Sequence, residues 1–253
     1  MKIFLTGASS GIGAALASHY ASSGAQLGLF ARRADPLEKL AASLGSPAPA
    51  IYAGDVRDAR SLREAAGDFI ARFGVPDIVI ANAGVSVGTS TAHAEDNEVF
   101  RAIVDTNVLG MVYTFQPFLS AMVAARHGTL AGIASVAGFR GLPGAGAYSA
   151  SKAAAIAYLE SLRVELVGSG VAVVTICPGY IATPMTEGNP YPMPFLLPAD
   201  RAGQLIARAI DRQQSFYVLP WQMAWLGRLL KILPRSIYDR ALAGRPGKPR
   251  LRH

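Results

Sequence analysis

The stretch Thr6-Gly7-Ala8-Ser9-Ser10-Gly11-Ile12-Gly13 joins an apolar run at residues 2–6 to a helical pattern at residues 11–23. Gly7 suits a tight turn, Gly11 lets the backbone approach a pyrophosphate, and Gly13 lets the helix pack closely on the strand. Free backbone N–H groups at the start of a helix attract phosphate oxygens. This junction therefore predicts the first strand, loop and helix of a dinucleotide-binding sheet, with Ser9, Ser10 and Ile12 in the loop. A glycine turn that binds nothing is the alternative.

Short apolar runs alternate with helical patterns over residues 1–220. We expect strands at residues 2–6, 26–31, 50–54, 77–81, 128–134, 171–177 and 216–219. We expect helices at residues 11–23, 35–44, 58–73, 95–105, 107–125, 147–167 and 200–212. The run at 171–177 is apolar on both faces, as in a parallel sheet that is covered on both sides. The alternation predicts an α/β fold, a Rossmann-like doubly wound parallel sheet of about seven strands with helices on both faces, in a single domain.

Length and composition agree with that prediction. The chain has 253 residues, of which 51% are hydrophobic, enough for one large α/β domain. No apolar run reaches the roughly 18 residues that span a bilayer, and an expected strand follows Met1 directly, without a cleavage site. The single cysteine, Cys177, excludes an internal disulfide framework and a cysteine-cluster metal site. We therefore expect a cytoplasmic protein with no metal centre.

The net charge of +7 is concentrated at the end of the chain. Residues 1–220 carry sixteen Lys or Arg and sixteen Asp or Glu, whereas residues 221–253 carry eight Lys or Arg and only Asp239. The body of the protein therefore has no basic surface of the kind that binds nucleic acid, and we expect no nucleic-acid partner.

The second expected strand ends at Ala31-Arg32-Arg33. Enzymes that prefer NAD place an acidic residue near this point, where it binds the ribose 2′-hydroxyl. A guanidinium instead suits a 2′-phosphate, because it offers both charge and a forked donor geometry. The sequence favours NADP(H) over NAD(H), and the alternative is that both arginines are merely solvated at a strand end.

Tyr148 and Lys152 are four residues apart at the start of a strong helical pattern, so they share one face of the helix. A free tyrosine has a pKa of about 10, and an adjacent ammonium favours the phenolate and lowers that pKa. A pKa nearer the working pH makes the phenol a better proton shuttle. Ser135, thirteen residues before Tyr148, could hydrogen-bond the oxygen that gains or loses the proton. A surface pair without a role is the alternative.

Taken together, these motifs resemble the classical short-chain dehydrogenase/reductase family over about residues 1–220. Thr6–Gly13 is similar to the family's cofactor loop, Asp55-Val56 to its adenine contact, and Asn82-Ala83-Gly84 to the motif that steadies the sheet beside the adenosine. The stretch Pro178-Gly179 through Ile181 and Thr183 resembles the loop that contacts the nicotinamide carboxamide. Asn107, Ser135, Tyr148 and Lys152 resemble the catalytic tetrad. Asp55 and Asn82 as turn residues, and Asn107 as a helix cap, are the structural alternatives.

The resemblance implies hydride transfer between nicotinamide C4 and a carbonyl or carbinol carbon, without a metal. It implies that Tyr148 is the acid/base, that Lys152 lowers its pKa and holds the nicotinamide ribose, and that Ser135 orients the substrate oxygen. Asn107 would anchor a water that relays protons to Lys152.

One departure from the family concerns the cofactor loop. Some NADP-using members carry a basic residue in this loop, where this chain has Ser9 and Ser10. Recognition of a 2′-phosphate would therefore depend on Arg32 and Arg33. A protein that senses the cofactor, or a scaffold that binds it without turnover, is the alternative function.

Residues 184–198 contain several prolines, which exclude a regular helix, so we expect a lid loop at about 182–199. The substrate would lie between this lid, Ser135 and Tyr148. The expected pocket wall is apolar and consists of Phe139, Leu142, Tyr180, Met185, Tyr191, Met193 and Phe195. This region offers no arginine or lysine clamp for a carboxylate or phosphate, so an apolar ketone or secondary alcohol is the expected substrate. The alternative is that some of these side chains simply close the core.

Residues 221–243 predict an amphipathic, basic C-terminal helical extension. Trp221, Trp225, Leu229 and Ile232 form one helical stripe, and Arg228, Lys231 and Arg235 form another. Packing on the domain or on a partner subunit is favoured, in a homo-dimer or homo-tetramer, and peripheral contact with an anionic membrane comes second. The final residues, 244–253, are expected to be a disordered basic tail.

Overall fold

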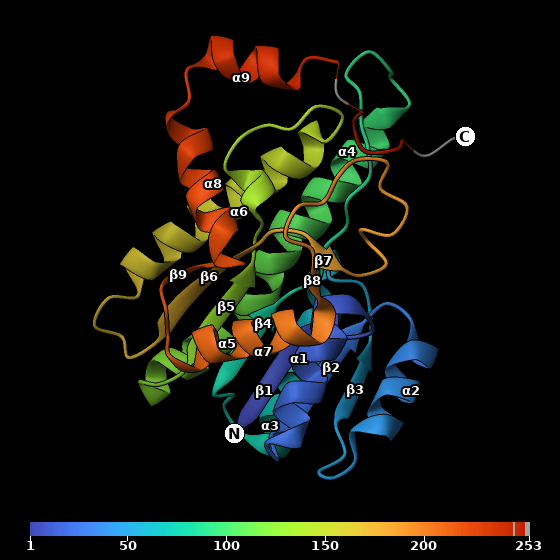
Figure 1. Cartoon of the computed structure of the whole chain (residues 1–253). Helices are drawn as coiled ribbons and strands as arrows, with labels where there is room; N and C mark the ends of the chain where they lie inside the picture. Colours follow the sequence, from blue (N-terminus) through green and yellow to red (C-terminus); the bar gives the residue numbers. More distant parts are fainter. Residues whose placement is uncertain (245, 251–253) are drawn as a thin grey trace.

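A computed structural model describes residues 1–244 and 246–250, and it has one seven-stranded parallel sheet with the strand order β3-β2-β1-β4-β5-β6-β9 (Figure 1). The strands are β1 (Lys2–Thr6), β2 (Gln26–Ala31), β3 (Ala50–Ala53), β4 (Ile78–Ala81), β5 (Thr129–Ile133), β6 (Ala172–Pro178) and β9 (Phe216–Leu219). All seven expected strands and the Rossmann-like fold are confirmed. The strand order reverses between β1 and β4, and ligands of such sheets bind in the crevice outside the carboxyl ends of the strands at this point.

Helices cover both faces of the sheet. Leu16, Leu37 and Ile206 bring α1 (Gly11–Ser22), α2 (Ala34–Leu44) and α7 (Ala199–Asp211) into one buried cluster. On the other face, Phe69, Phe118 and Leu159 bring α3 (Ala59–Phe73), α5 (Gly110–Ala125) and α6 (Gly146–Glu165) into a second cluster. The apolar strands thus pack against helices on both sides, which explains why they do not alternate between polar and apolar residues.

The expected break between two helices near residue 106 is wrong. Instead, α4 (Asp96–Val104) continues through a π-helical turn, η1 (Asp105–Leu109), into α5. The polar residues of this turn look like a helix end in the sequence, yet Asn107 is buried inside the continuous helix. By length and composition the 30-residue helix could span a membrane. Phe115 and Phe118 are nevertheless buried in the core, as in the core helix of a globular domain.

The C-terminal extension is two helices rather than one, α8 (Trp221–Ile232) and α9 (Arg235–Leu242). Pro234 separates them, because proline cannot continue a helix from its interior. The loop at 139–141 anchors both. The Arg140 guanidinium donates to the Leu230 and Leu233 carbonyls at 2.6 and 3.1 Å, and the Tyr238 hydroxyl donates to the Gly141 carbonyl at 2.6 Å.

Two further segments depart from the expectations. Two short parallel strands, β7 (Ile181–Ala182) and β8 (Leu197–Pro198), pair with each other and join the two ends of the lid. The tail was expected to be disordered throughout, but residues 246–250 lie against the domain, where Gly88 N–H donates to the Pro249 carbonyl at 2.9 Å. Residues 245 and 251–253, which belong to the same prediction, lie outside the described residues.

Candidate active site

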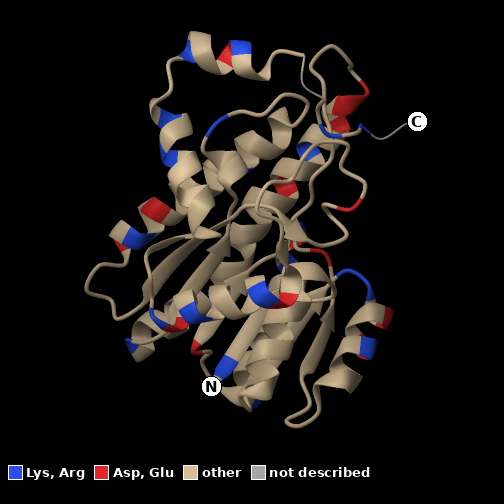
Figure 2. Cartoon of the chain, viewed as in Figure 1, with Lys and Arg blue, Asp and Glu red and all other residues tan. Residues whose placement is uncertain are grey.

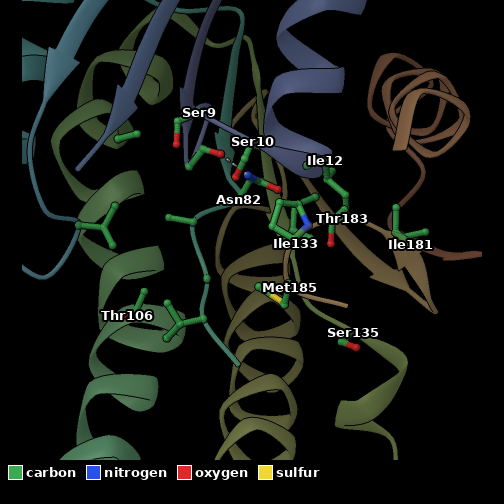
Figure 3. A pocket seen from close by; sticks show the side chains of 18 of the residues that line it. Ser9, Ser10, Ile12, Asn82, Thr106, Ile133, Ser135, Ile181, Thr183 and Met185 are labelled. Carbon is green, nitrogen blue, oxygen red and sulfur yellow. Dashed lines mark hydrogen bonds between the residues drawn. The ribbon is translucent and has the colours of Figure 1, made fainter. Parts of the chain in front are cut away.

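A cavity of about 300 Å³ lies at the carboxyl ends of the central strands. Figure 3 shows Ser9, Ser10 and Asn82 at one end, and Met185 and Ser135 toward the other. The expected cofactor residues that line the cavity are Gly7, Ser9, Ser10, Gly11, Ile12, Arg32, Arg33, Asp55, Val56, Asn82, Ala83, Gly84, Tyr148, Lys152, Pro178, Gly179, Ile181 and Thr183. Gly13 instead lies behind the loop, where an added Cβ would meet Asn82 Nδ2 at 2.7 Å.

The glycine loop is shaped to receive a phosphate. Gly7 and Gly11 have φ angles of 67° and 55°, which favour glycine. Asn82 Nδ2 donates to the carbonyls of Thr6 and Gly7, both at 3.1 Å, and so fixes the loop to the end of β4. A Cβ on Gly11 would lie 3.0 Å from the Thr183 methyl group, so a larger residue would fill the cradle. The helix N-cap, Ser10, makes no side-chain capping bond, which leaves the first N–H groups of α1 to a ligand.

Two arginines line the end of the cavity that lies away from Ser135 and Met185. Arg32 and Arg33 follow β2, and Asp55 follows β3. Arg57 pairs with the Asp55 carboxylate at 2.7 to 3.1 Å. Hydrogen bonds from Arg57, with a smaller contribution from the charge of Arg32, lower the pKa of Asp55. The sequence analysis missed Arg57, although its place two residues after Asp55 is the spacing of an Asx turn.

Lys152 is buried beneath the reactive end of the cavity, with 4% of its surface exposed. Its ammonium donates to the Ile133 carbonyl at 2.8 Å and lies 5.8 Å from the centre of the Tyr148 ring. Burial lowers the pKa of Lys152 to about 8. The helical i, i+4 spacing thus brings the two side chains together as the sequence predicts.

The pKa of Tyr148 is raised, which is opposite to the direction expected from the Tyr148–Lys152 pair. Burial of the phenol is the largest cause, and a hydrogen bond with Ser135 opposes it. The Ser135 hydroxyl also accepts the Ala137 N–H at 3.1 Å, which fixes it at the end of β5. In the protein alone, therefore, desolvation outweighs the groups that favour the phenolate.

Asn107 lies behind the cavity rather than in its lining. Its Oδ1 accepts the Val85 N–H at 2.8 Å, and its Nδ2 donates to the Val85 carbonyl at 3.0 Å and to Ser151 Oγ at 2.9 Å. Ser151 Oγ in turn donates to the Tyr148 carbonyl at 2.8 Å. Asn107 thus joins the loop after β4 to the helix that carries Tyr148. Its expected role as the anchor of a water relay stays a prediction.

The sequence profile of the short chain dehydrogenase family matches residues 1–191, about three quarters of the chain. The chain belongs to the short-chain dehydrogenase family. An uncharacterized oxidoreductase of Myxococcus xanthus (strain DK1622) is 40% identical to this dehydrogenase over 240 residues, which are 94% of each chain.

Two further proteins, which carry specific dehydrogenase names, are also similar to this short-chain dehydrogenase. The 11-beta-hydroxysteroid dehydrogenase 1A of Arabidopsis thaliana is 37% identical over 190 residues, which are 74% of this chain and 54% of the plant protein. The structure of an alcohol dehydrogenase from Thermococcus sibiricus, complexed with 5-hydroxy-NADP, matches with a TM-score of 0.76 and 28% identity. That match covers 86% of this chain and 95% of the archaeal one.

Of the seven expected wall residues of this short-chain dehydrogenase, Met185 is the one that lines the described cavity. Phe139 instead stacks on Phe216, with ring centres 6.2 Å apart, and a Cβ on Gly227 of α8 would collide with its ring. Leu142 faces a second hollow under α9. The loop after β5 therefore uses its apolar side chains to dock the C-terminal helices.

The other four expected wall residues are Tyr180, which lies just before the lid, and Tyr191, Met193 and Phe195, which lie within it. The rings of Tyr180 and Tyr191 are 6.3 Å apart, and Asn189 Nδ2 approaches Met193 Sδ at 3.6 Å. Phe195 has a φ of 59° and is half exposed. These side chains therefore contact one another rather than the described cavity, and the Tyr191 phenol adds a small contribution that raises the pKa of Tyr148.

The cavity also has lining residues that the sequence analysis missed. They lie one or two positions from the expected ones, at strand ends, in the π-helical turn and in the lid: Ala31, Gly54, Val85, Thr106, Ile133, Ala134, Pro184 and Thr186. For Ala31, Gly54, Val85, Ile133 and Ala134, the carboxyl ends of the expected strands were the available signal.

Proposed function

We propose that this short-chain dehydrogenase is an NADP(H)-dependent oxidoreductase that interconverts an apolar ketone and the matching secondary alcohol. The observation that carries the proposal is that Ser135, Tyr148 and Lys152 border the same cavity as the glycine loop. A sensor or scaffold that binds a cofactor without turnover has no need of a half-buried tyrosine beside a buried lysine and a serine. The test is a screen of apolar ketones and alcohols that follows the absorbance of NADPH.

In the proposed mechanism the bound nicotinamide supplies the hydride chemistry, and the protein provides binding, orientation and proton transfer. Ser135 Oγ donates a hydrogen bond to the substrate oxygen. Tyr148 donates its phenolic proton to that oxygen in reduction and takes it back in oxidation. Lys152, held by the Ile133 carbonyl, places its positive charge beneath the phenol and favours the phenolate.

Arg32 and Arg33 are proposed to favour NADP(H) over NAD(H). Both line the cavity, and Asp55, the nearby acid, already pairs with Arg57. Because its carboxylate oxygens already accept hydrogen bonds from Arg57, Asp55 is less available to accept hydrogen bonds from the ribose hydroxyls that NAD would present. The similar alcohol dehydrogenase of Thermococcus sibiricus was solved with 5-hydroxy-NADP, which agrees with this choice.

Arg32→Asp is expected to weaken NADPH binding about 10- to 100-fold, because a charge-assisted hydrogen bond contributes about 1.5–3 kcal/mol. NADH binding should change far less, since NADH lacks the 2′-phosphate. The measurement is a titration of cofactor fluorescence. Arg63→Asp, which makes the same charge change on the exposed face of α3, is the matched control. Equal NADPH affinity in Arg32→Asp and wild type would show that Arg32 does not bind the 2′-phosphate.

The exposed side of α8 is proposed to contact an anionic membrane surface at the periphery. Trp221, Trp225, Leu229 and Ile232 are 68%, 64%, 54% and 79% exposed. At about 100° per residue they fall within one quarter of the helix circumference. Met223 and Gly227, on the opposite side, are buried against the domain. One face of α8 therefore packs on its own domain, but it is not the face expected from the sequence, because the apolar stripe points outward.

The charges near the stripe favour a lipid surface over a second copy of the chain. Arg228, Arg235 and Arg240 lie on α8 and α9 near the stripe, and Asp239 is the only acid in the segment (Figure 2). A two-fold pairing of α8 with itself would bring like charges together. Anionic headgroups instead complement them at about 1 kcal/mol per residue, and tryptophan favours the membrane interface. A cytoplasmic location and a homo-dimer or homo-tetramer formed through other surfaces remain part of this proposal.

Vesicle co-sedimentation tests the membrane contact. The intact chain should bind vesicles of phosphatidylglycerol and phosphatidylcholine, release them as salt rises, and ignore pure phosphatidylcholine. Replacing Arg228, Arg235 and Arg240 by Gln should weaken binding about 100-fold, from about 3 kcal/mol. Val167→Ser, at an exposed apolar residue elsewhere, is the control. If Trp221→Ala and Trp225→Ala split an oligomer while the wild type ignores vesicles, the stripe is a subunit interface.

A further inference from the structure

Residues 246–250, here called the strap, touch three loops at the mouth of the cavity. These loops follow β4, β5 and β6, whose carboxyl ends lie at one edge of the sheet. Gly88 in the first loop forms a parallel bridge with Arg250, and a Cβ on Gly144 in the second would lie 2.8 Å from Gly247. The Lys248 ammonium donates to the carbonyl of Met185, in the lid, at 3.1 Å. Figure 1 shows the strap between the lid and the loop that precedes α4.

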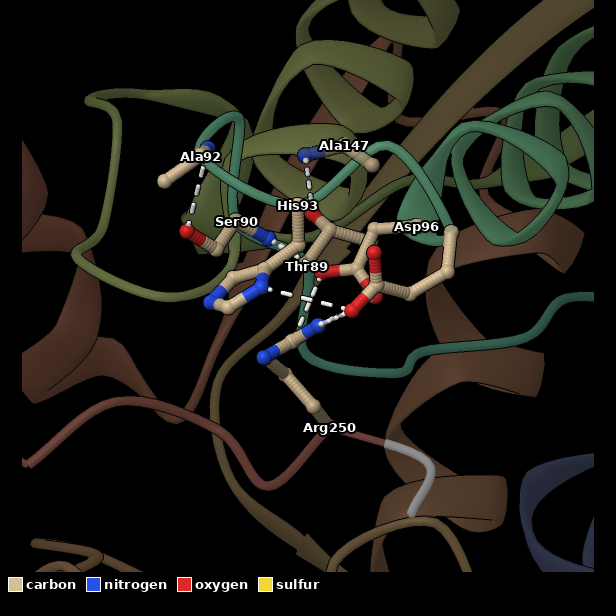
Figure 4. Close-up of polar contacts among 8 residues, drawn as sticks. Thr89, Ser90, Ala92, His93, Asp96, Ala147 and Arg250 are labelled. Atoms are coloured by element: carbon tan, nitrogen blue, oxygen red, sulfur yellow. Dashed lines mark hydrogen bonds and ion pairs between the residues drawn. The ribbon is translucent and has the colours of Figure 1, made fainter. Parts of the chain in front are cut away.

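Arg250 fastens the strap by a forked ion pair. Its Nε and Nη2 donate to the two carboxylate oxygens of Asp96 at 2.7 and 3.1 Å, and Nη2 also reaches Glu95 at 3.2 Å (Figure 4). The Asp96 side chain is only 6% exposed, and it accepts the Ser90 N–H at 2.7 Å. Little water can solvate a carboxylate that is buried to this extent, so the Asp96 carboxylate strongly favours a neighbouring cation.

The loop that the strap fastens also holds the helix of the reactive tyrosine. Thr89 N–H donates to the Gly144 carbonyl at 3.1 Å, and Thr89 Oγ1 accepts the Ala147 N–H at 3.4 Å (Figure 4). Ala147 directly precedes Tyr148 in the first turn of α6. A chain of contacts therefore runs from Arg250 through the loop after β4 to the start of this helix.

We infer that the strap is the outer wall of the substrate site and that Arg250 is the positioning residue that holds it there. The strap would limit the size of the substrate, since it joins the three loops that contain Gly88, Gly144 and Met185, and each of these loops also has residues that line the cavity. The strap also brings a cation to the lid, although the Lys248 ammonium is bonded to the Met185 carbonyl. The inference about substrate size rests on the proposed function, whereas the docking of the strap does not.

Hydrogen exchange at the Gly88 amide tests the docking without any substrate. This amide is bonded to the Pro249 carbonyl, so Arg250→Gln should speed its exchange about tenfold or more. Arg250→Lys should restore part of the protection, because it keeps one charge for Asp96. Arg63→Gln removes an exposed cation of α3 that makes no ion pair within the described residues, and it should leave the exchange of the Gly88 amide unchanged. Unchanged exchange in Arg250→Gln would overturn the inference.

A steric variant tests the wall without altering any charge. A Cβ on Gly88 would collide with the Lys248 carbonyl, so Gly88→Ala should displace the strap. Gly141→Ala, in a neighbouring loop, meets no described atom within 4 Å and is the matched control. The ratio of kcat/KM for a bulky ketone to that for a small one should rise about tenfold in Gly88→Ala and in Arg250→Gln. NADPH affinity should stay within about twofold of wild type, since the strap does not touch the glycine loop.

An unchanged kcat/KM ratio in both variants, with Gly88 exchange accelerated, would show that the strap docks but forms no wall. An absence of turnover on every ketone and alcohol would contradict the proposed function instead. The exchange measurement would then still decide whether Arg250 fastens the strap.

Discussion

Tyr148→Phe is expected to lower kcat about 10²- to 10⁴-fold on any substrate found by the ketone and alcohol screen, the range that general acid–base catalysis contributes. The substitution removes the phenolic hydroxyl and leaves the ring in place. Asn107 contacts α6 through Ser151 Oγ, which in turn donates to the Tyr148 backbone carbonyl, so the phenolic hydroxyl takes no part and the helix should keep its position. Initial rates with saturating NADPH measure the effect.

NADPH affinity should change little in Tyr148→Phe, because the phenol is one of many groups around the cavity. Tyr158→Phe is the matched control, since Tyr158 lies further along the same helix and packs against the core. It should keep wild-type turnover. Wild-type kcat in Tyr148→Phe would show that another group moves the proton.

Lys152→Met is expected to abolish turnover and, at the same time, to stabilise the cofactor-free protein at about pH 7. Burial lowers the pKa of Lys152 from 10.5 to about 8. A difference of this size corresponds to roughly 3 kcal/mol of unfavourable free energy when the ammonium is charged. Methionine fills a similar volume and carries no charge. Loss of the hydrogen bond to the Ile133 carbonyl offsets part of the gain, which leaves about 1–2 kcal/mol.

The pH dependence of stability identifies the cause. Between about pH 8 and 10.5 the unfolded chain binds more protons at Lys152 than the folded chain does, so the wild type gains stability as the pH rises. The advantage of Lys152→Met should therefore be largest below about pH 8 and shrink toward pH 10.5. Urea unfolding at about pH 7 and pH 10 measures it, with the exposed Lys39→Met as the control. A stability difference that does not vary with pH would refute the assignment.

Local sequence alone determined the fold and the centre of the site. Strand and helix patterns depend on neighbouring residues, so all seven sheet strands were predictable, and parallel packing explains their apolar faces. The glycine loop and the Tyr148–Lys152 pair were also predictable. Each depends on spacing within one turn or loop, and the chain geometry then fixes where the residues lie.

Only the tertiary structure decided the surroundings of the site. Phe139 is a large apolar residue of the kind that lines a substrate pocket. Its ring instead faces α8, because Gly227 has no side chain and leaves room for it. The polar turn at 105–109 looks like a helix end, but the buried bonds of Asn107 to Val85 and Ser151 stabilise a continuous helix. These partners are 22 and 44 residues away in sequence.

The C-terminal tail shows the same division most clearly. Its prolines, glycines and cations are typical of a disordered segment, because they favour no regular structure on their own. Its position depends on Asp96, which lies 154 residues before Arg250 in the sequence. The Asp96 carboxylate is buried and accepts hydrogen bonds from the Arg250 guanidinium. The composition of a segment indicates only which structure the segment favours in isolation. A partner brought close by the fold can supply the free energy that orders it, and no local pattern in the tail encodes that partner.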